Sequence, residues 1–191
     1  MTKIAVIVGS IRPGSFNKML AKLAVARLEA HGATVTEVDL AVFELPIYSA
    51  GLEANNFPPN ALRLKQMLSE QDGLLMVSPE YNGSIPPLLK NAIDWASRPT
   101  GDEGLIAFTA YRGKAAAIMA ASLSPFGGLR GLVHLRQILN AVEMVVIPEQ
   151  VVIPAAHTAY ESDGQLREDL PAMLVDNTAA RLIKVAAALA D

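Results

Sequence analysis

The sequence predicts an α/β protein built on a doubly wound parallel sheet of five strands. Apolar runs short enough to be strands alternate with stretches whose apolar residues recur at helical spacing. The runs at 3–8, 73–78 and 114–121 lack the alternation of a half-exposed strand, so each is expected to be buried on both faces. A polar, glycine-containing loop follows each of these three runs. In a parallel sheet, such loops lie at the edge where ligands bind.

Five strands and five helices are expected. The strands are residues 3–8, 33–38, 73–78, 114–121 and 143–147. The helices are residues 16–31, 58–72, 87–97, 129–141 and 168–189. The stretches 40–57, 98–113 and 148–166 are expected to be loops. No repeat or linker divides the chain, so we expect one domain over residues 1–191.

The helix ends carry recognisable signals. The first helix ends at Gly32, which suits the left-handed residue that follows many helices. The second begins at Pro58-Pro59, because proline is tolerated in a first turn, and ends at Asp72-Gly73. The last helix repeats apolar residues on one face, including Leu182 and Leu189.

The helix expected at 87–97 is apolar on two sides. One stripe is Leu88, Ala92 and Trp95, and the other is Leu89, Ile93 and Ala96. A helix of this kind needs two surfaces to pack against. The sheet provides one, and a partner subunit would provide the second, which favours a dimer. The alternative is a helix that the rest of its own chain covers.

Composition excludes several classes of function. The chain has 191 residues, a formal net charge of −3 and no cysteine, so a general nucleic-acid surface, a disulfide framework and a thiolate metal site are not expected. Its three histidines lack metal-ligand spacing. Residues 1–3 lead directly into a strand, and no apolar run reaches the roughly 18–20 residues that a membrane helix needs. We therefore expect a cytoplasmic protein without a membrane partner.

The loop at 9–17 has the composition of a phosphate site. It lies between a strand and a helix, so backbone N–H groups and the helix dipole face the loop. Ser10, Ser15 and Asn17 add neutral hydrogen-bonding groups, and Arg12 adds a planar cation suited to phosphate. The alternative is an ordinary turn in which Ser15 or Asn17 only caps the helix.

Three well-known phosphate loops do not match. No Gly-Lys-Ser/Thr run follows Gly9, and Ile11 stands where the dinucleotide fingerprint requires glycine. A phosphatase loop would need a cysteine. A terminal monophosphate suits the remaining donors. Asp39 follows the second strand, where a dinucleotide-binding fold places its ribose-binding acid, but without the glycine fingerprint we favour a strand-end aspartate.

The strand order places this loop beside a second one. Of the two common orders for doubly wound sheets, 2-1-3-4-5 has its switch point between strands one and three. The polar loops 9–17 and 79–84 follow those two strands. The segment 79–83 contains a proline, an aromatic residue, an amide and a glycine, which suit the edge of a planar ring. In the alternative interpretation, its proline and glycine only set the geometry of a turn.

Both loops resemble those of a known family. Gly9-Ser10-x-Arg12-x-x-Ser15-x-Asn17, Pro79-Glu80-Tyr81-Asn82-x-Ser84-x-Pro86 and residues 89–95 (LKNAIDW) are similar to motifs of the NADPH-dependent FMN reductases. The later segments Gly127-Gly128-x-Arg130 and 134–136 also resemble that family. The resemblance implies a flavodoxin-like fold and non-covalently bound FMN, with NADPH or NADH as co-substrate. It also implies a homodimer or homotetramer.

The resemblance also implies a set of cofactor-binding residues. Those expected at the FMN phosphate and ribityl end are Ser10, Arg12, Ser15, Phe16 and Asn17. Those expected along the isoalloxazine are Pro79, Glu80, Tyr81, Asn82 and Gly83, with Ser122 and Gly127 near its other edge. No catalytic side chain and no metal ligand is expected, because the flavin carries the chemistry.

The implied reaction is ping-pong electron transfer. A hydride passes from NADPH or NADH to bound FMN, and a small-molecule acceptor of quinone, azo, flavin or chromate type then takes the electrons. The alternative is an FMN-binding electron carrier without its own NAD(P)H oxidation, although such carriers are usually more acidic than this chain. A third possibility is a flavin-free binding module with the same fold.

Overall fold

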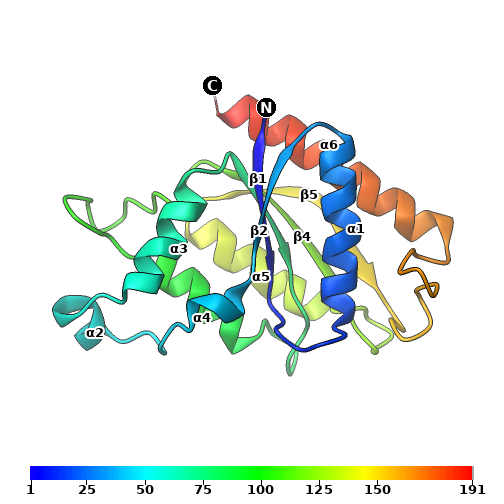
Figure 1. Cartoon of the computed structure of the whole chain (residues 1–191), viewed down its shortest axis with the longest axis horizontal. Coiled ribbons are helices and arrows are strands. Elements are labelled where there is room, and N and C mark those ends of the chain that lie inside the picture. The colour runs from blue at the N-terminus through cyan, green and yellow to red at the C-terminus, as the bar shows by residue number, and fades with distance from the viewer. Residues whose placement is uncertain (191) are drawn as a thin grey trace.

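The computed structural model describes residues 1–190 and contains the expected sheet (Figure 1). Its five parallel strands are β1 (Lys3–Val8), β2 (Thr34–Val38), β3 (Gly73–Val77), β4 (Ala115–Ala121) and β5 (Val145–Ile153). They lie in the order β2-β1-β3-β4-β5. The predicted fold class and strand order are therefore confirmed.

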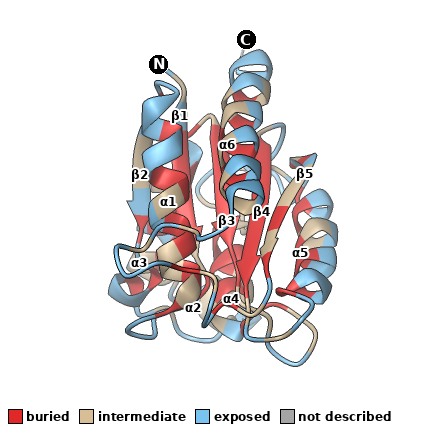
Figure 2. Cartoon of the chain, turned by 90° about the vertical axis from the view of Figure 1, so that its right-hand side faces the viewer, coloured by how far each residue is buried: buried red, intermediate tan, exposed pale blue. Residues whose placement is uncertain are grey.

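Helices cover both faces of the sheet, as a doubly wound fold requires. The α-helices are α1 (Phe16–Ala30), α2 (Ala50–Asn55), α3 (Pro59–Ser69), α4 (Pro87–Ala96), α5 (Leu129–Ala141) and α6 (Asp169–Leu189). The apolar faces of α1 and α6 share one core cluster with the sheet, and those of α3, α4 and α5 share another. Figure 2 shows α1 and α6 side by side over one face.

The central strands are buried because helices cover them on both faces. Every residue of β3 and β4 is buried. In β4, five of the seven residues are alanine, which leaves room for the helices to approach closely. The loops after these strands therefore start from rigid ends.

The prediction for the last strand was too short. Residues 148–153, expected as loop, belong to β5, which contains Pro148. In the pairing with β4, the register shifts between Ala116 and Ile118, whose partners are Val146 and Gln150. Proline is tolerated at an edge strand or a bulge, and Pro148 lies at both.

The stretch 40–57, expected as loop, contains two short helices. A 3₁₀ turn, η1 (Leu40–Phe43), begins where the Asp39 carboxylate accepts a hydrogen bond from the N–H of Ala41. The helix α2 begins where Ser49 Oγ accepts one from Leu52 N–H. Short polar side chains cap helices in this way. The capping residues are visible in the sequence, but no apolar pattern predicts the short helices that follow them.

The chain itself covers both apolar sides of α4. Trp95 is fully buried, its indole N–H donates to the carbonyl of Pro46 at 2.7 Å, and Tyr48 and Phe57 pack edge-on against its ring. Asn91 holds the same loop by donating to the Pro46 carbonyl and accepting from Tyr48 N–H. The two-sided helix therefore gives no argument for a partner subunit.

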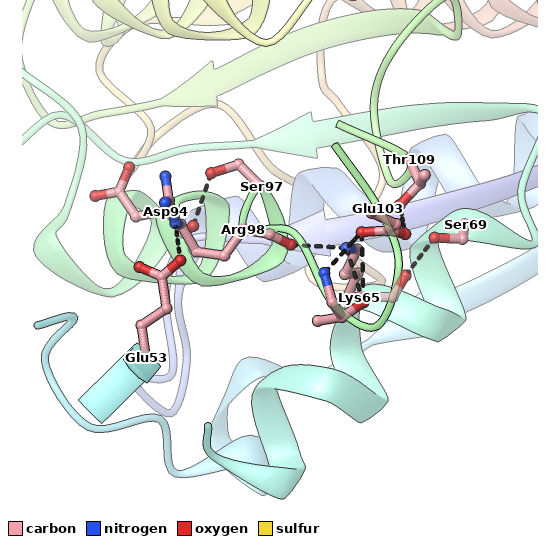
Figure 3. A network of polar contacts seen from close by, with 9 residues as sticks. Glu53, Lys65, Ser69, Asp94, Ser97, Arg98, Glu103 and Thr109 are labelled. Carbon is pink, nitrogen blue, oxygen red and sulfur yellow. Dashed lines mark hydrogen bonds and ion pairs between the residues drawn. The ribbon is translucent and has the colours of Figure 1, made fainter. Parts of the chain in front are cut away.

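A polar network fastens the connection between α4 and β4 (Figure 3). The Lys65 side chain is only 3% exposed, and its ammonium group donates to the Arg98 carbonyl and to Thr100 Oγ1 and pairs with the Glu103 carboxylate. Arg98 Nε donates to Glu53 Oε1 at 2.8 Å, which joins α2 to the same network.

Within residues 1–190, no helix combines the length and hydropathy needed to cross a bilayer.

Candidate functional site

The two polar loops predicted at the switch point are neighbours. The N–H of Gly9 donates to the carbonyl of Val77 at 2.9 Å, so the loops after β1 and β3 leave the sheet together. A Cβ on Gly9 would lie 3.3 Å from Leu89 and 3.4 Å from Pro79, which shows how closely the two segments approach. In Figure 1 these loops lie at the lower edge of the sheet, with the loop after β4 beside them.

The N-terminus of α1 has the donors of an anion site. Ser15 occupies the N-cap position with only 3% of its surface exposed, but its side chain makes no capping hydrogen bond with the described part of α1. The first turn of α1 contains no acidic residue, so nothing in it neutralises the positive end of the helix dipole. Ser10 is also buried, at 5% exposure. Arg12 is exposed, and it has no carboxylate partner among residues 1–190.

Asn17 is paired with the backbone at the end of β4. Its Nδ2 donates to the Ala121 carbonyl at 2.8 Å, and its Oδ1 accepts from the Ala121 N–H at 2.9 Å. The side chain is 4% exposed. Asn17 thus ties the first loop to the strand that precedes the third loop. Its predicted contact with FMN stays a prediction, and one amide hydrogen and one oxygen lone pair are left for it.

Phe16 packs against a C-terminal segment. Its ring stacks on Tyr160 with centroids 6.1 Å apart and planes 8° apart, and the Tyr160 hydroxyl donates to the Phe16 carbonyl at 3.2 Å. Burial raises the pKa of Tyr160 well above its ordinary value. The neutral phenol is therefore a permanent donor at physiological pH, and it fixes the start of α1 from outside the loop.

The second loop is a tight hairpin turn. Tyr81 and Ser84 exchange two backbone hydrogen bonds, and Asn82 and Gly83 between them have φ values of 51° and 80°. Asn-Gly is the preferred pair for a two-residue turn with two positive φ angles. The turn presents the Tyr81 side chain, which is 51% exposed, at the edge of the sheet. Exposed aromatic surface at a strand end suits contact with a planar ligand.

The Glu80 side chain fixes this loop to α5. Arg130 Nε donates to Glu80 Oε1 at 2.8 Å, and the N–H of Gly131 donates to Glu80 Oε2 at 3.3 Å. The Glu80 side chain is 6% exposed, whereas that of Arg130 is 60% exposed. His134 Nδ1 and Ser84 Oγ are 3.0 Å apart and form a second link. Sequence reasoning did not pair Arg130 with Glu80, because the two lie 50 residues apart.

The third loop lies beside the second. Gly128 precedes α5 with φ of 97°, and a Cβ there would lie 2.6 Å from the Ala120 Cβ. At Gly127 a Cβ would lie 2.9 Å from the backbone nitrogen of Pro154. Only glycine fits such close approaches. Ser122, the other residue predicted here, accepts a hydrogen bond from Ser124 N–H and so shapes the loop.

The structure therefore brings the predicted residues of all three loops to one edge of the sheet. The part of the chain that the structure describes contains no group of three histidine, aspartate or glutamate side chains that could hold a metal ion. A parallel sheet of this order, with polar loops at its switch point, defines the class of flavodoxin-like nucleotide-binding proteins.

Comparison with known proteins agrees with this class. The model of the NADPH-dependent FMN reductase family matches residues 2–158. The chain is 36% identical to an NAD(P)H-dependent FMN reductase of Pseudomonas aeruginosa, over 87% of this chain and 85% of that protein. It is 41% identical to a 2-hydroxy-1,4-benzoquinone reductase of a Burkholderia species, over 86% and 85%. The solved structure of the NAD(P)H:(acceptor) oxidoreductase of Paracoccus denitrificans matches with a TM-score of 0.83, 29% identity and 98% coverage of both chains.

The chain belongs to the NADPH-dependent FMN reductase family. It is an enzyme with FMN as its cofactor and NADPH or NADH as electron donor. The donors at the start of α1 fit that cofactor, because a serine hydroxyl without a capping bond and a guanidinium without a carboxylate partner among residues 1–190 suit a terminal phosphate. The edge with Tyr81 and the backbone of residues 79–83 suits a planar ring.

Proposed function

We propose that the enzyme passes electrons from NADPH or NADH through bound FMN to a quinone, azo, flavin or chromate-type acceptor, in a ping-pong reaction. Quinones are the acceptors that we favour, because two relatives at 40% identity or more act on quinones according to their names. When bound, FMN supplies the redox chemistry by accepting a hydride equivalent and passing the electrons on. The protein binds the flavin, orients it and shields it.

The roles of the residues follow from their positions. Arg12, Ser10 and Ser15 are proposed to hold the phosphate with charge-assisted and neutral hydrogen bonds. The backbone of 79–83 is proposed to bind the ring edge, with Tyr81 beside it. Glu80 keeps that backbone in place through Arg130. We assign no catalytic side chain, because neither half-reaction needs a protein nucleophile.

One observation carries the proposal. Ser15, a residue only 3% exposed, stands at the start of α1 without a capping hydrogen bond, and three residues before it lies Arg12, whose guanidinium has no carboxylate partner within the described residues. A serine that served only as a helix cap would accept a hydrogen bond from the first turn. The absence of that bond within the described residues favours the ligand-binding interpretation over the ordinary turn.

The competing function is an electron carrier that binds FMN but does not oxidise NAD(P)H. Its sequence would be expected to carry a larger negative charge, whereas this chain has a formal net charge of −3. Family membership favours the reductase.

Stopped-flow absorbance on the FMN-loaded, desalted protein tests the proposal. NADPH or NADH added without oxygen should bleach the flavin, and a quinone added afterwards should restore its colour. Steady-state double-reciprocal plots should then be parallel, as a ping-pong reaction requires. Retained colour that neither nucleotide bleaches would identify the carrier instead, and a protein that retains no flavin would contradict both.

We also propose a homodimer or homotetramer, on the family resemblance, and a cytoplasmic location, on the sequence features given above. Sedimentation equilibrium and cell fractionation test them.

A further inference from the structure

A cavity of about 170 Å³ lies beside the proposed phosphate site, between α1 and the edge strand β2. Ser10 belongs to both the loop after β1 and the wall of this cavity. Val6, Val8 and Ala21 form an apolar floor. The volume corresponds to about six water molecules at liquid density, which suits one flat bicyclic ring.

Opposite charges face each other across the cavity. Lys18 and Lys22 stand one helical turn apart on α1, and Glu37 and Asp39 line the β2 side. None of these four groups has an ion-pair partner among residues 1–190. Lys18 lies in the first turn of α1, where a cation is disfavoured by the helix dipole unless an anion offsets it. The cavity thus suits a ligand with an anionic group, donor groups and an apolar ring.

The strand order places this cavity at one end of a line. Along the ligand-binding edge the strands run β4, β3, β1, β2. The proposed ring site lies at the loops after β3 and β4, and the proposed phosphate site at the loop after β1. The cavity beside β2 therefore lies beyond the phosphate, on the side away from the ring. A ligand that continues past the FMN phosphate in the same direction would enter it.

FAD is such a ligand, because it extends FMN by an adenosine monophosphate group through that phosphate. Its second phosphate would meet Lys18 and Lys22, and its adenine the apolar floor. Asp39 follows β2, the position from which dinucleotide-binding folds hold the adenosine ribose. One Asp39 oxygen accepts from Ala41 N–H, and the other is available for a hydroxyl. A pyridine nucleotide fits less well, since its nicotinamide must lie at the ring, at the other end of the line.

We propose that this enzyme binds FAD as well as FMN in one site, with the adenine of FAD in the cavity between α1 and β2 and its ribose and second phosphate at the charged residues that line the cavity. This proposal rests on the proposed FMN site, because both flavins would share the phosphate loop. FMN and FAD present the same isoalloxazine, so either would support the proposed reaction.

Isothermal titration calorimetry of the flavin-free protein with FMN and with FAD tests the proposal. The expected dissociation constant for FAD is within about tenfold of that for FMN. Lys22→Ala should weaken FAD binding by about tenfold, the size of one lost charge-assisted contact, and FMN binding by less than about threefold. Lys184→Ala, an exposed lysine on α6, is the charge-matched control and should alter neither.

The outcomes separate the two proposals. If the protein binds FMN but binds FAD more than about a hundredfold more weakly, the FAD site is overturned and the proposed function is unaffected. Equal losses for both flavins in Lys22→Ala would show a general charge effect and would also overturn it. A protein that binds neither flavin would contradict the proposed function itself, and the FAD site with it.

Discussion

Replacing Asn17 by alanine would separate a structural role from a cofactor-binding role. In the structure, the amide of Asn17 makes two hydrogen bonds to the backbone of Ala121, at 2.8 and 2.9 Å. Both partners are almost fully buried, with 4% and 3% of their surfaces exposed. Removing the amide leaves the N–H and the carbonyl of Ala121 without their partner.

The expected loss of stability follows from these contacts. A buried backbone group left without a hydrogen bond costs about 1–3 kcal/mol. Two such groups would cost about 2–6 kcal/mol, but water that enters the vacated space can satisfy part of them. We therefore expect Asn17→Ala to lower the free energy of unfolding by about 3 kcal/mol, a factor of more than about a hundred in the folding equilibrium.

Urea unfolding of the flavin-free protein measures this loss, since bound FMN would add its own stabilisation. Asn177→Ala, at an exposed position of α6, is the matched control and should change the free energy by less than about 0.5 kcal/mol. A loss below about 1 kcal/mol in Asn17→Ala, together with FMN binding weakened more than about tenfold, would rule out a mainly structural role for Asn17. Asn17 would then act mainly as a ligand of the cofactor.

Three further predictions concern ionic contacts. Arg130→Ala should weaken FMN binding severalfold without changing the fold seen by circular dichroism, because the Glu80 carboxylate loses its cation and its loop loosens; unchanged affinity would count against that anchor. Desolvation raises the pKa of Glu103, but hydrogen bonds from Lys65, Thr100 and Thr109 outweigh it and hold that pKa below its ordinary value. The stability that Glu103 provides should therefore be present above its ordinary pKa of 4.5 and lost as the pH falls through the lower folded-state pKa. Unfolding curves of wild type and Glu103→Gln should then converge in acid. Burial lowers the pKa of Lys114 to about 8. Between that pH and the unfolded value of about 10.4, the unfolded chain binds more protons than the folded one, so the stability should rise with pH. The slope of the unfolding free energy against pH should be smaller in Lys114→Met, and equal slopes would contradict this shift of the Lys114 pKa.

The sequence predicted the sheet because its central strands are apolar on both faces. β1, β3 and β4 were recognisable from continuous apolar runs, and the predicted order was one of the two common orders, with which the positions of the polar loops agreed. The end of β5 was missed because Pro148 and the polar pair after it resemble a loop. Only the bulge in the pairing with β4 explains how the strand continues past them. That information lies in the partner strand, not in the local sequence.

The same limit applies to the candidate site. The positions of the loops could be predicted, since strand ends are local features. The pairing of Asn17 with Ala121, of Glu80 with Arg130 and of Phe16 with Tyr160 could not, because each joins segments 50 or more residues apart. The two apolar sides of α4 do not support a dimer, because a distant segment of the same chain covers the second side. Its second apolar side is covered by Tyr48 and Phe57, from a stretch without an apolar pattern.

The central claim is that the loop after β1 holds the FMN phosphate, and the ratio of FMN to riboflavin affinity tests it most directly. The two flavins differ only by the phosphate, so the ratio isolates that contact from the ring. Calorimetry on wild type, on Arg12→Ala and on Arg27→Ala, at the far end of the same helix, supplies the comparison. Arg12→Ala should lower the ratio by about tenfold or more, through loss of a charge-assisted hydrogen bond, with riboflavin affinity unchanged. If Arg12→Ala leaves the ratio at the wild-type value, the loop after β1 does not hold the phosphate through Arg12.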